Sequence, residues 1–160
     1  MKIVIAAIGH LKTGPEKTLS AEYETRIQGL GRQAGISGLT TVDWAESRLG
    51  DAALRGAEEA KNLWSVVPQG TSVCVLDERG EALSSAAFAK FIENEAARGV
   101  KQLTFMIGGP DGHTADTRAK ALKKISFGPM TWPHRLVRVM LLEQIYRSVT
   151  ILVNHPYHRA

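Results

Sequence analysis

Short apolar runs alternate along the chain with longer segments in which apolar residues recur every three or four positions. Runs such as KIVIAAIG (2–9) and TSVCVLD (71–77) are rich in Val and Ile, which is typical of buried strands. In the segment after the first run, Leu19, Tyr23 and Ile27 are spaced as on one face of a helix. The pattern predicts strands at 2–9, 38–44, 71–77, 102–109 and 125–128, and helices at 15–30, 51–67, 84–99, 114–124 and 133–152.

Residues suited to helix ends stand at several of these boundaries. Asp51 and Ser84 precede helical patterns, where their side chains can accept hydrogen bonds from free backbone N–H groups. Gly99 closes one helix, and Pro133 stands in the first turn of the last, where a missing N–H costs nothing. The boundaries therefore agree with the periodicity.

Regular alternation of strand and helix indicates the fold class. It predicts an α/β fold in which a mostly parallel sheet is covered by helices on both faces. Because the chain contains no repeat, low-complexity tract or linker, we expect one domain over residues 1–160.

The last predicted helix is apolar on almost every side. Its apolar residues are Leu136, Val137, Val139, Met140, Leu141, Leu142 and Ile145. Such a helix is either buried within its own chain or covered by a partner, and we expect a homodimer.

The composition fits an ordinary soluble domain, with 44% hydrophobic and 22% charged residues. No apolar run approaches the roughly 18 residues that a membrane helix requires. The opening segment is better explained as a first strand than as a signal peptide. Cys74, the only cysteine, cannot form an internal disulfide and is expected to be a buried thiol. These features together predict a cytoplasmic protein.

Positive charge is concentrated toward the end of the chain. Residues 117–160 contain eight Lys and Arg but only one acidic residue, Glu143, whereas residues 1–116 have a balance of −3. This asymmetry suits a polyanion partner such as nucleic acid, although a solvated basic face would look the same.

Three segments that contain glycine or proline follow predicted strands: LDERG (76–80), IGGPDGH (107–113) and FGPMTWPH (127–134). In a parallel sheet, ligands bind beyond the carboxyl ends of the strands. Glycines allow close approach of the backbone to a ligand, while Met130 and Trp132 offer apolar surface for a purine. For each segment, a plain tight connection is the alternative.

The sequence of these segments excludes two kinds of nucleotide-binding motif. The dinucleotide fingerprint G-x-G-x-x-G is missing, and so is the Gly-Lys-Ser/Thr ending of a phosphate-binding loop. A close-approach loop without phosphate chemistry suits a ligand bound through adenine, ribose and amino-acid groups, such as S-adenosylmethionine.

The chain ends in the polar segment NHPYHRA. His155 and Tyr157 could stack on bases and Arg159 could pair with phosphate, which favours RNA contact. A metal site is disfavoured because His155 and His158 have no cysteine nearby and His134 is distant in sequence. No motif supports a serine or cysteine nucleophile.

Together, IGGPDG, MTWPHRLVRVMLLEQIYR and the terminal NHPYHR resemble the ribosomal large subunit methyltransferase H family. The resemblance extends over essentially the whole chain. These are small SPOUT-class enzymes, and the resemblance implies a C-terminal trefoil knot, a homodimer and S-adenosylmethionine as cofactor. It also implies methylation of N3 of a pseudouridine in 23S rRNA. His113 and Trp132 depart from the usual family pattern.

Site residues follow from matching positions and from the chemistry of the tail. The cofactor contacts implied by the resemblance are Leu76, Gly108, Phe127, Gly128, Pro129, Met130, Thr131 and Trp132. The expected catalytic residues are His155, Tyr157 and His158, with either histidine as the base that takes the N3 proton and solvent as the alternative. The expected RNA contacts are Arg138, Arg147, Asn154 and Arg159, and no metal is expected. For Arg147 the alternative is an ion pair with Glu143 at i,i+4.

A second function stays open from the residues alone. A non-catalytic RNA- or ribosome-binding module would use the same charge asymmetry without needing the glycine segments. A nucleotide-phosphate hydrolase is disfavoured by the missing phosphate-binding loop. So small a domain has little surface for reading sequence, so we expect the substrate to be folded 23S rRNA in an assembled ribosome.

Overall fold

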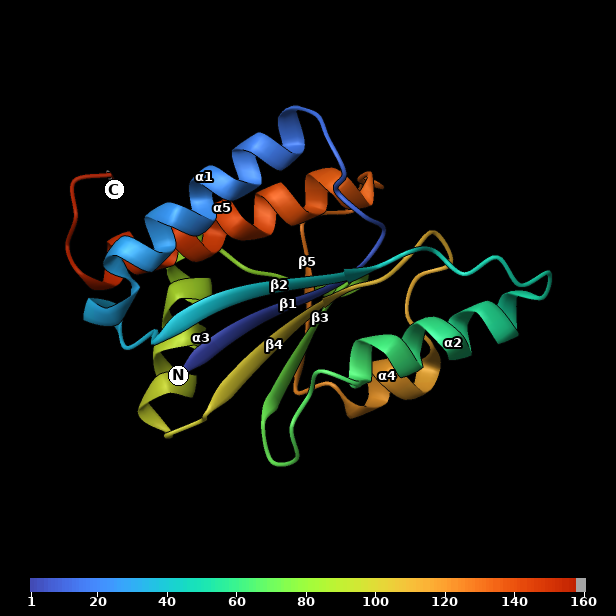
Figure 1. Ribbon diagram of the computed structural model, residues 1–160. Helices are drawn as coiled ribbons and strands as arrows, with labels where there is room; N and C mark the ends of the chain where they lie inside the picture. The colour runs from blue at the N-terminus through green and yellow to red at the C-terminus, as the bar shows by residue number, and fades with distance from the viewer. Residues whose placement is uncertain (158–160) are drawn as a thin grey trace.

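The computed structural model describes residues 1–157 and contains every predicted element (Figure 1). The strands are β1 (Lys2–Ile8), β2 (Gly38–Trp44), β3 (Ser72–Ala82), β4 (Gln102–Ile107) and β5 (Lys123–Ser126). The helices are α1 (Pro15–Leu30), α2 (Ala52–Trp64), α3 (Ser85–Ala97), α4 (Ala115–Lys120) and α5 (His134–Leu152), with a short 3-10 helix η1 (Gly31–Ala34) after α1. The predicted caps are present: Asp51 accepts from the N–H of Leu54, and Ser84 from that of Ala87.

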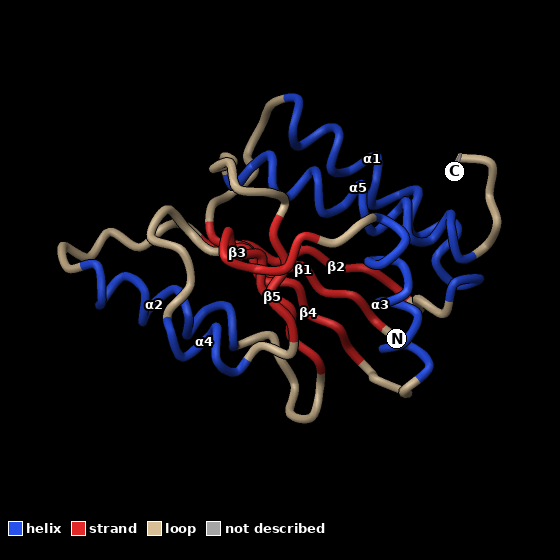
Figure 2. The backbone as a smooth tube through the Cα atoms, turned by 180° about the vertical axis from the view of Figure 1, so that it is seen from behind, coloured by secondary structure: helices blue, strands red, loops and turns tan. Residues whose placement is uncertain are grey.

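The sheet is parallel throughout, in the order β2-β1-β4-β3-β5. Helices α1, α3 and α5 lie on one face, and α2 and α4 lie on the other (Figures 1 and 2). Side chains of β1 alternate between the two faces: Ile3 and Ile5 join the core under α5, and Ala6 and Ile8 join the smaller core under α2. The predicted fold class is thereby confirmed.

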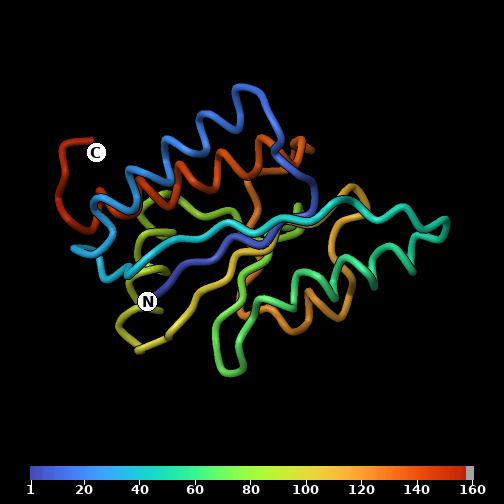
Figure 3. Tube along the Cα trace, viewed as in Figure 1, coloured from blue at the N-terminus to red at the C-terminus, as the bar shows by residue number. Residues whose placement is uncertain are grey.

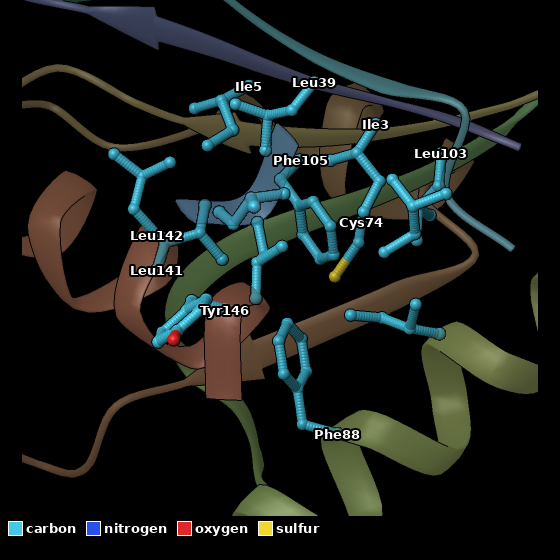
Figure 4. Close-up of a cluster of buried hydrophobic side chains, with 14 of the residues drawn as sticks. Ile3, Ile5, Leu39, Cys74, Phe88, Leu103, Phe105, Leu141, Leu142 and Tyr146 are labelled. Carbon is cyan, nitrogen blue, oxygen red and sulfur yellow. The ribbon is translucent and has the colours of Figure 1, made fainter. Parts of the chain in front are cut away.

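The larger core explains why α5 is so apolar (Figure 4). Leu141, Leu142 and Ile145 are fully buried against the sheet. Cys74 is buried in the same core, as predicted, and burial raises the pKa of its thiol well above the usual range. Most of the apolar surface of α5 is therefore covered by its own chain, although Leu136 near its start stays 39% exposed.

Several element boundaries differ from the sequence prediction, two of them because of pairing between distant strands. The helix expected at 114–124 ends at Lys120, because the next residues turn into the ladder of β3: the N–H of Leu122 donates to the carbonyl of Val73, and Lys123 pairs with Cys74. β3 runs five residues past its predicted end at Asp77, to Ala82. Pairing with a distant strand overrides local periodicity at both places.

The extension of β3 encloses β5. Leu76 and Glu81 both pair with Ile125, so the residues between them bulge outward and return to the same strand. Gly80 lies directly on the β5 backbone, since a Cβ there would sit 2.6 Å from the carbonyl carbon of Ile125. Only glycine fits this close approach, and the bulge carries Asp77, Glu78 and Arg79 to one end of the sheet.

Among residues 1–157, no helix is long and apolar enough to cross a membrane.

Candidate active site

A cavity of about 510 Å³ opens where β3, β4 and β5 end. All three segments predicted to bind a ligand line it. Of the eight expected cofactor contacts, the cavity wall includes Leu76, Gly108, Phe127, Gly128, Met130, Thr131 and Trp132. Pro129 belongs to the same loop but does not line the wall. A volume of this size is typical of small-ligand sites.

Residues 108–112, called here the glycine loop, form one tight turn. The N–H of Gly112 donates to the carbonyl of Gly109 at 2.9 Å, and Gly112 has a positive φ of 72°. A side chain at Gly108 would crowd the turn, because a Cβ there would lie 3.1 Å from the Gly112 backbone. The loop thus presents backbone to the cavity wall.

Residues 127–133, called here the proline loop, are held by their own hydrogen bonds. Ser126 Oγ accepts from the N–H of Gly128 and donates to its carbonyl, and Trp132 Nε1 donates to the carbonyl of Phe127 at 3.3 Å. Met130 is nevertheless 70% exposed and Trp132 40% exposed. Large apolar side chains left open beside a cavity favour a ligand or partner that covers them.

One polar side chain in the cavity wall is almost fully buried. His113 is 6% exposed, and its Nε2 has no hydrogen-bond partner among the described residues. Burial lowers the pKa of His113, and nearby Asp77 only partly opposes this. Arg118 donates to the carbonyl of His113 and lies 3.6 Å from Asp77. The histidine therefore contributes a neutral imidazole to the wall.

Arg138 contradicts its predicted role as an RNA contact. It is 3% exposed; its Nη1 donates to Asp43 at 2.6 Å and its Nη2 to the carbonyl of Gly9 at 2.5 Å. His10 lies 2.6 Å from the other oxygen of Asp43. Burial opposes ionisation of Asp43, but the bonds from His10 and Arg138 outweigh it and lower its pKa. Arg138 therefore fastens α5 to the ends of β1 and β2.

The ion pair with Asp43 was missed because its partners are far apart in sequence. The available signal was Asp43 itself, an acid near the end of a strand whose carboxyl end had to meet the last helix. Charge counting alone treated every arginine after residue 116 as surface charge.

At the far end of α5, Arg147 also has a partner within its chain. It donates to Glu143 at 2.5 and 2.9 Å, the ion pair considered as the alternative to RNA contact. Its guanidinium lies 5.2 Å from the ring centre of Tyr157, whose ring meets that of Tyr146 edge-on at 4.8 Å. Tyr157 is thus packed onto α5.

Asn154 and His155 lie between the end of α5 and Tyr157. Asn154 is exposed and takes a left-handed φ of 54°, which turns the chain after α5. The Nδ1 of His155 accepts from the N–H of Tyr157 at 3.2 Å. The predicted residues His158 and Arg159 lie outside the described residues.

The cavity is lined by His134 and Val137 at the start of α5, whereas the tail follows the other end of that helix. The course of α5 between the two ends can be followed in Figures 1 and 3. The helix has 19 residues, which corresponds to about 28 Å at roughly 1.5 Å per residue. Neither His155 nor Tyr157 lines the cavity of its own chain. Within one chain, the length of α5 therefore separates the described residues expected to be catalytic from the expected cofactor contacts.

Residues 1–157 contain no group of three or more His, Cys, Asp or Glu side chains placed to hold a metal ion.

Comparison with known proteins gives the family. A family model described as a predicted SPOUT methyltransferase matches residues 1–158. The ribosomal RNA large subunit methyltransferase H of Rhodopseudomonas palustris (strain BisB5) is 49% identical over 160 residues, 100% of both chains. That of Bradyrhizobium sp. (strain ORS 278) is 48% identical over 100% of this chain and 99% of its own.

Among solved structures, a probable methylase family protein from Haemophilus influenzae Rd KW20 shares the fold. Its TM-score is 0.50 at 14% identity, over 95% of this chain and 66% of its own. The sequence resemblance is confirmed, and the chain belongs to the SPOUT methyltransferases, in the family of the ribosomal RNA large subunit methyltransferases H.

Proposed function

We propose that this SPOUT methyltransferase transfers a methyl group from S-adenosylmethionine to N3 of a pseudouridine in 23S rRNA. The observation that carries the proposal is the single cavity built from all three predicted loops. The full-length relatives are named as methyltransferases of large-subunit ribosomal RNA, which supports the substrate.

The cavity wall fits the methyl donor. Backbone of the glycine loop can approach ribose and amino-acid groups closely, and Leu76, Met130 and Trp132 offer apolar surface for adenine. When bound, S-adenosylmethionine supplies a methyl group that is already activated by its sulfonium. The chain contributes orientation, which is worth up to about 7–11 kcal/mol in favourable cases.

The proposal includes a homodimer, because the described part of the tail, up to Tyr157, does not line the cavity of its own chain. A second copy would bring its own tail, with His155, Tyr157 and His158, to this cavity. The exposed Leu19 and Leu136 on α1 and α5, with the exposed Met130 and Trp132, support an apolar contact between copies. One tail histidine would then receive the N3 proton, with solvent as the alternative acceptor.

Two further expectations belong to the same proposal. The trefoil knot implied by family membership is supported by the enclosure of β5 between Leu76 and Glu81. Arg147, Asn154 and Arg159 would contact folded rRNA in an assembled ribosome, in the cytoplasm.

Mass mapping of rRNA tests the function. Ribosomes and free rRNA from a strain that lacks this protein are incubated with the purified chain and S-adenosylmethionine. We expect one new methyl group on a pseudouridine of 23S rRNA, with intact ribosomes as the better substrate. No methylation of either substrate, together with no heat of binding in calorimetry with the donor, would instead favour the RNA-binding module.

A further inference from the structure

Helix α2 carries a buried carboxylate that the proposed reaction does not use. Glu59 is 4% exposed, and its Oε1 accepts from the backbone N–H of Ser47 at 3.0 Å. Its Oε2 has no hydrogen-bond partner among the described residues. Both oxygens face Gly109, since a Cβ on that glycine would lie 2.8 Å from Oε2 and 3.1 Å from Oε1. A buried carboxylate is costly, so its place between two loops needs an explanation.

One turn earlier on α2, Arg55 joins the same two loops. Its Nε donates to Asp111 of the glycine loop at 2.7 Å. Its Nη1 donates to the carbonyls of Leu49 and Gly50 at 2.9 and 3.0 Å. Residues 45–50, which follow β2, are called here the β2 loop. Arg55 and Glu59 are four positions apart and lie on one face of the helix. Arg55 bonds both loops, whereas Glu59 bonds the β2 loop and lies against Gly109 of the glycine loop.

The β2 loop also reaches the opposite side of the cavity. Glu46 Oε1 lies 3.7 Å from Nε2 of His134, a cavity-lining residue at the start of α5. The chain of contacts therefore runs from the glycine loop through α2 and the β2 loop to His134. Neither Arg55 nor Glu59 lines the cavity itself.

We propose that Arg55 and Glu59 form a clamp that fixes the glycine loop in the position needed to bind the methyl donor. They are positioning residues, and they act on donor affinity through Gly109 and Asp111. The inference rests on the proposed use of the cavity for S-adenosylmethionine. Because holding a loop in its bound conformation increases affinity, loosening the clamp is expected to weaken donor binding even though neither residue lines the cavity.

Calorimetry with S-adenosylmethionine tests the clamp in four variants of the full chain: Glu59→Ala, Glu59→Gln, Arg55→Met and Asp111→Asn. We expect Glu59→Ala and Arg55→Met to weaken donor binding at least about 10-fold. Glu59→Gln should lose less, because its amide oxygen can still accept from Ser47. Arg55→Met and Asp111→Asn should be non-additive when combined, since they break one contact.

Glu58→Gln is the matched control. Glu58 is the exposed neighbour of Glu59 on α2, and it accepts a bond from the Ser47 hydroxyl but has no contact with Gly109. The Glu58→Gln variant should bind the donor with the same affinity as the unmodified chain. In steady-state assays on ribosomes, the clamp variants should raise KM for the donor while kcat stays within about twofold, which a general loss of folded protein would not produce.

The binding and kinetic measurements distinguish three explanations. If the unmodified chain binds no donor, the proposed function fails. If it binds and Arg55→Met and Asp111→Asn bind equally well, the clamp is wrong; both side chains are partly exposed, so these variants keep the test valid even if Glu59→Ala fails to fold. If kcat falls while KM is unchanged, α2 only supports the fold.

Discussion

The two ends of α5 are built in opposite ways. At its start, the cavity is shaped by backbone: the glycine loop and the proline loop leave large apolar side chains open and rely on turns that only glycine permits. At its end, the structure depends on side chains, with Glu143, Arg147 and Tyr157 bonded and stacked upon one another. The first end is prepared for a ligand, whereas the second has already satisfied much of its own hydrogen-bonding capacity.

This difference separates binding from chemistry. A backbone-lined cavity can hold a methyl donor without any help from the tail. In the proposed reaction the proton acceptor belongs to the tail, about one helix length away. Changes at one end should therefore leave the function of the other measurable.

Removal of residues 155–160 is expected to have the largest effect. Methyl transfer should fall at least about 1,000-fold, since the expected base is lost together with one expected RNA contact, Arg159. The donor affinity of the truncated chain, measured by calorimetry, should stay within about twofold of the full chain's. Gly108→Val should instead abolish donor binding, because a side chain at position 108 meets the Gly112 backbone. Equal loss of donor binding after truncation would show that the tail shapes the cavity of its own chain.

Arg138 and Arg147, near the two ends of α5, should differ in their contribution to the free energy of unfolding. Arg138→Met should lower the free energy of unfolding by about 3–5 kcal/mol, because it leaves Asp43 without its buried partner. Arg147→Met breaks a partly exposed i,i+4 pair and should cost less than about 1 kcal/mol. Urea unfolding measures both; similar losses would contradict the assignment of Arg138 as the internal fastening.

Gly80→Ala tests the enclosure of β5 at the cavity end. The added methyl would meet the β5 backbone at 2.6 Å, and we expect a loss of about 1–3 kcal/mol in urea unfolding. Gly29→Ala in α1 is the control, since nothing lies within 4 Å of its Cβ position, and it should be neutral or stabilising. A tolerated Gly80→Ala would mean that β3 and β5 are not held so closely.

The pH dependence of the free energy of unfolding should show the smallest effect, with opposite signs for His113 in the cavity wall and Tyr157 after α5. The pKa of His113 is lowered by burial, so the unfolded chain binds more protons there and stability falls as pH drops below the unfolded value near 6.5. The pKa of Tyr157 is raised to about 12 by burial, with contributions from Tyr23 and Glu143. The stability that its neutral phenol provides is present below about pH 10 and is lost as pH rises toward 12.

Denaturant midpoints over the pH range, compared with those of His113→Leu and Tyr157→Phe, measure the two effects. His113→Leu should reduce the pH dependence of stability only on the acid side, and Tyr157→Phe only on the alkaline side. If either variant changed the pH dependence on the other side, the assignment of these groups would be wrong.

Much of the fold was predictable because it follows from local pattern. The buried strands, the caps Asp51 and Ser84 and the three loops at strand ends needed only periodicity and side-chain chemistry. Seven of the eight expected cofactor contacts line one cavity for the same reason, because parallel strands bring their carboxyl ends together.

The remaining features depend on contacts between distant segments. The extension of β3 needs β5, the burial of Arg138 needs Asp43, and the clamp on the glycine loop needs a helix that precedes it by some fifty residues. Composition places Arg138 and Arg147 in one basic stretch, yet one is a core residue and the other lies on the surface. Glu143 at i−4 marks only Arg147 as a local ion pair, and nothing local shows that Arg138 is buried.

The pairing of Ile125 with both Leu76 and Glu81 limits when the chain can become active. During synthesis, the bulge between those residues has nothing to wrap around until β5 has left the ribosome, and the proline loop follows β5. A nascent chain that lacks its last quarter therefore has no complete donor cavity, so methyl-donor binding reports that synthesis is nearly finished.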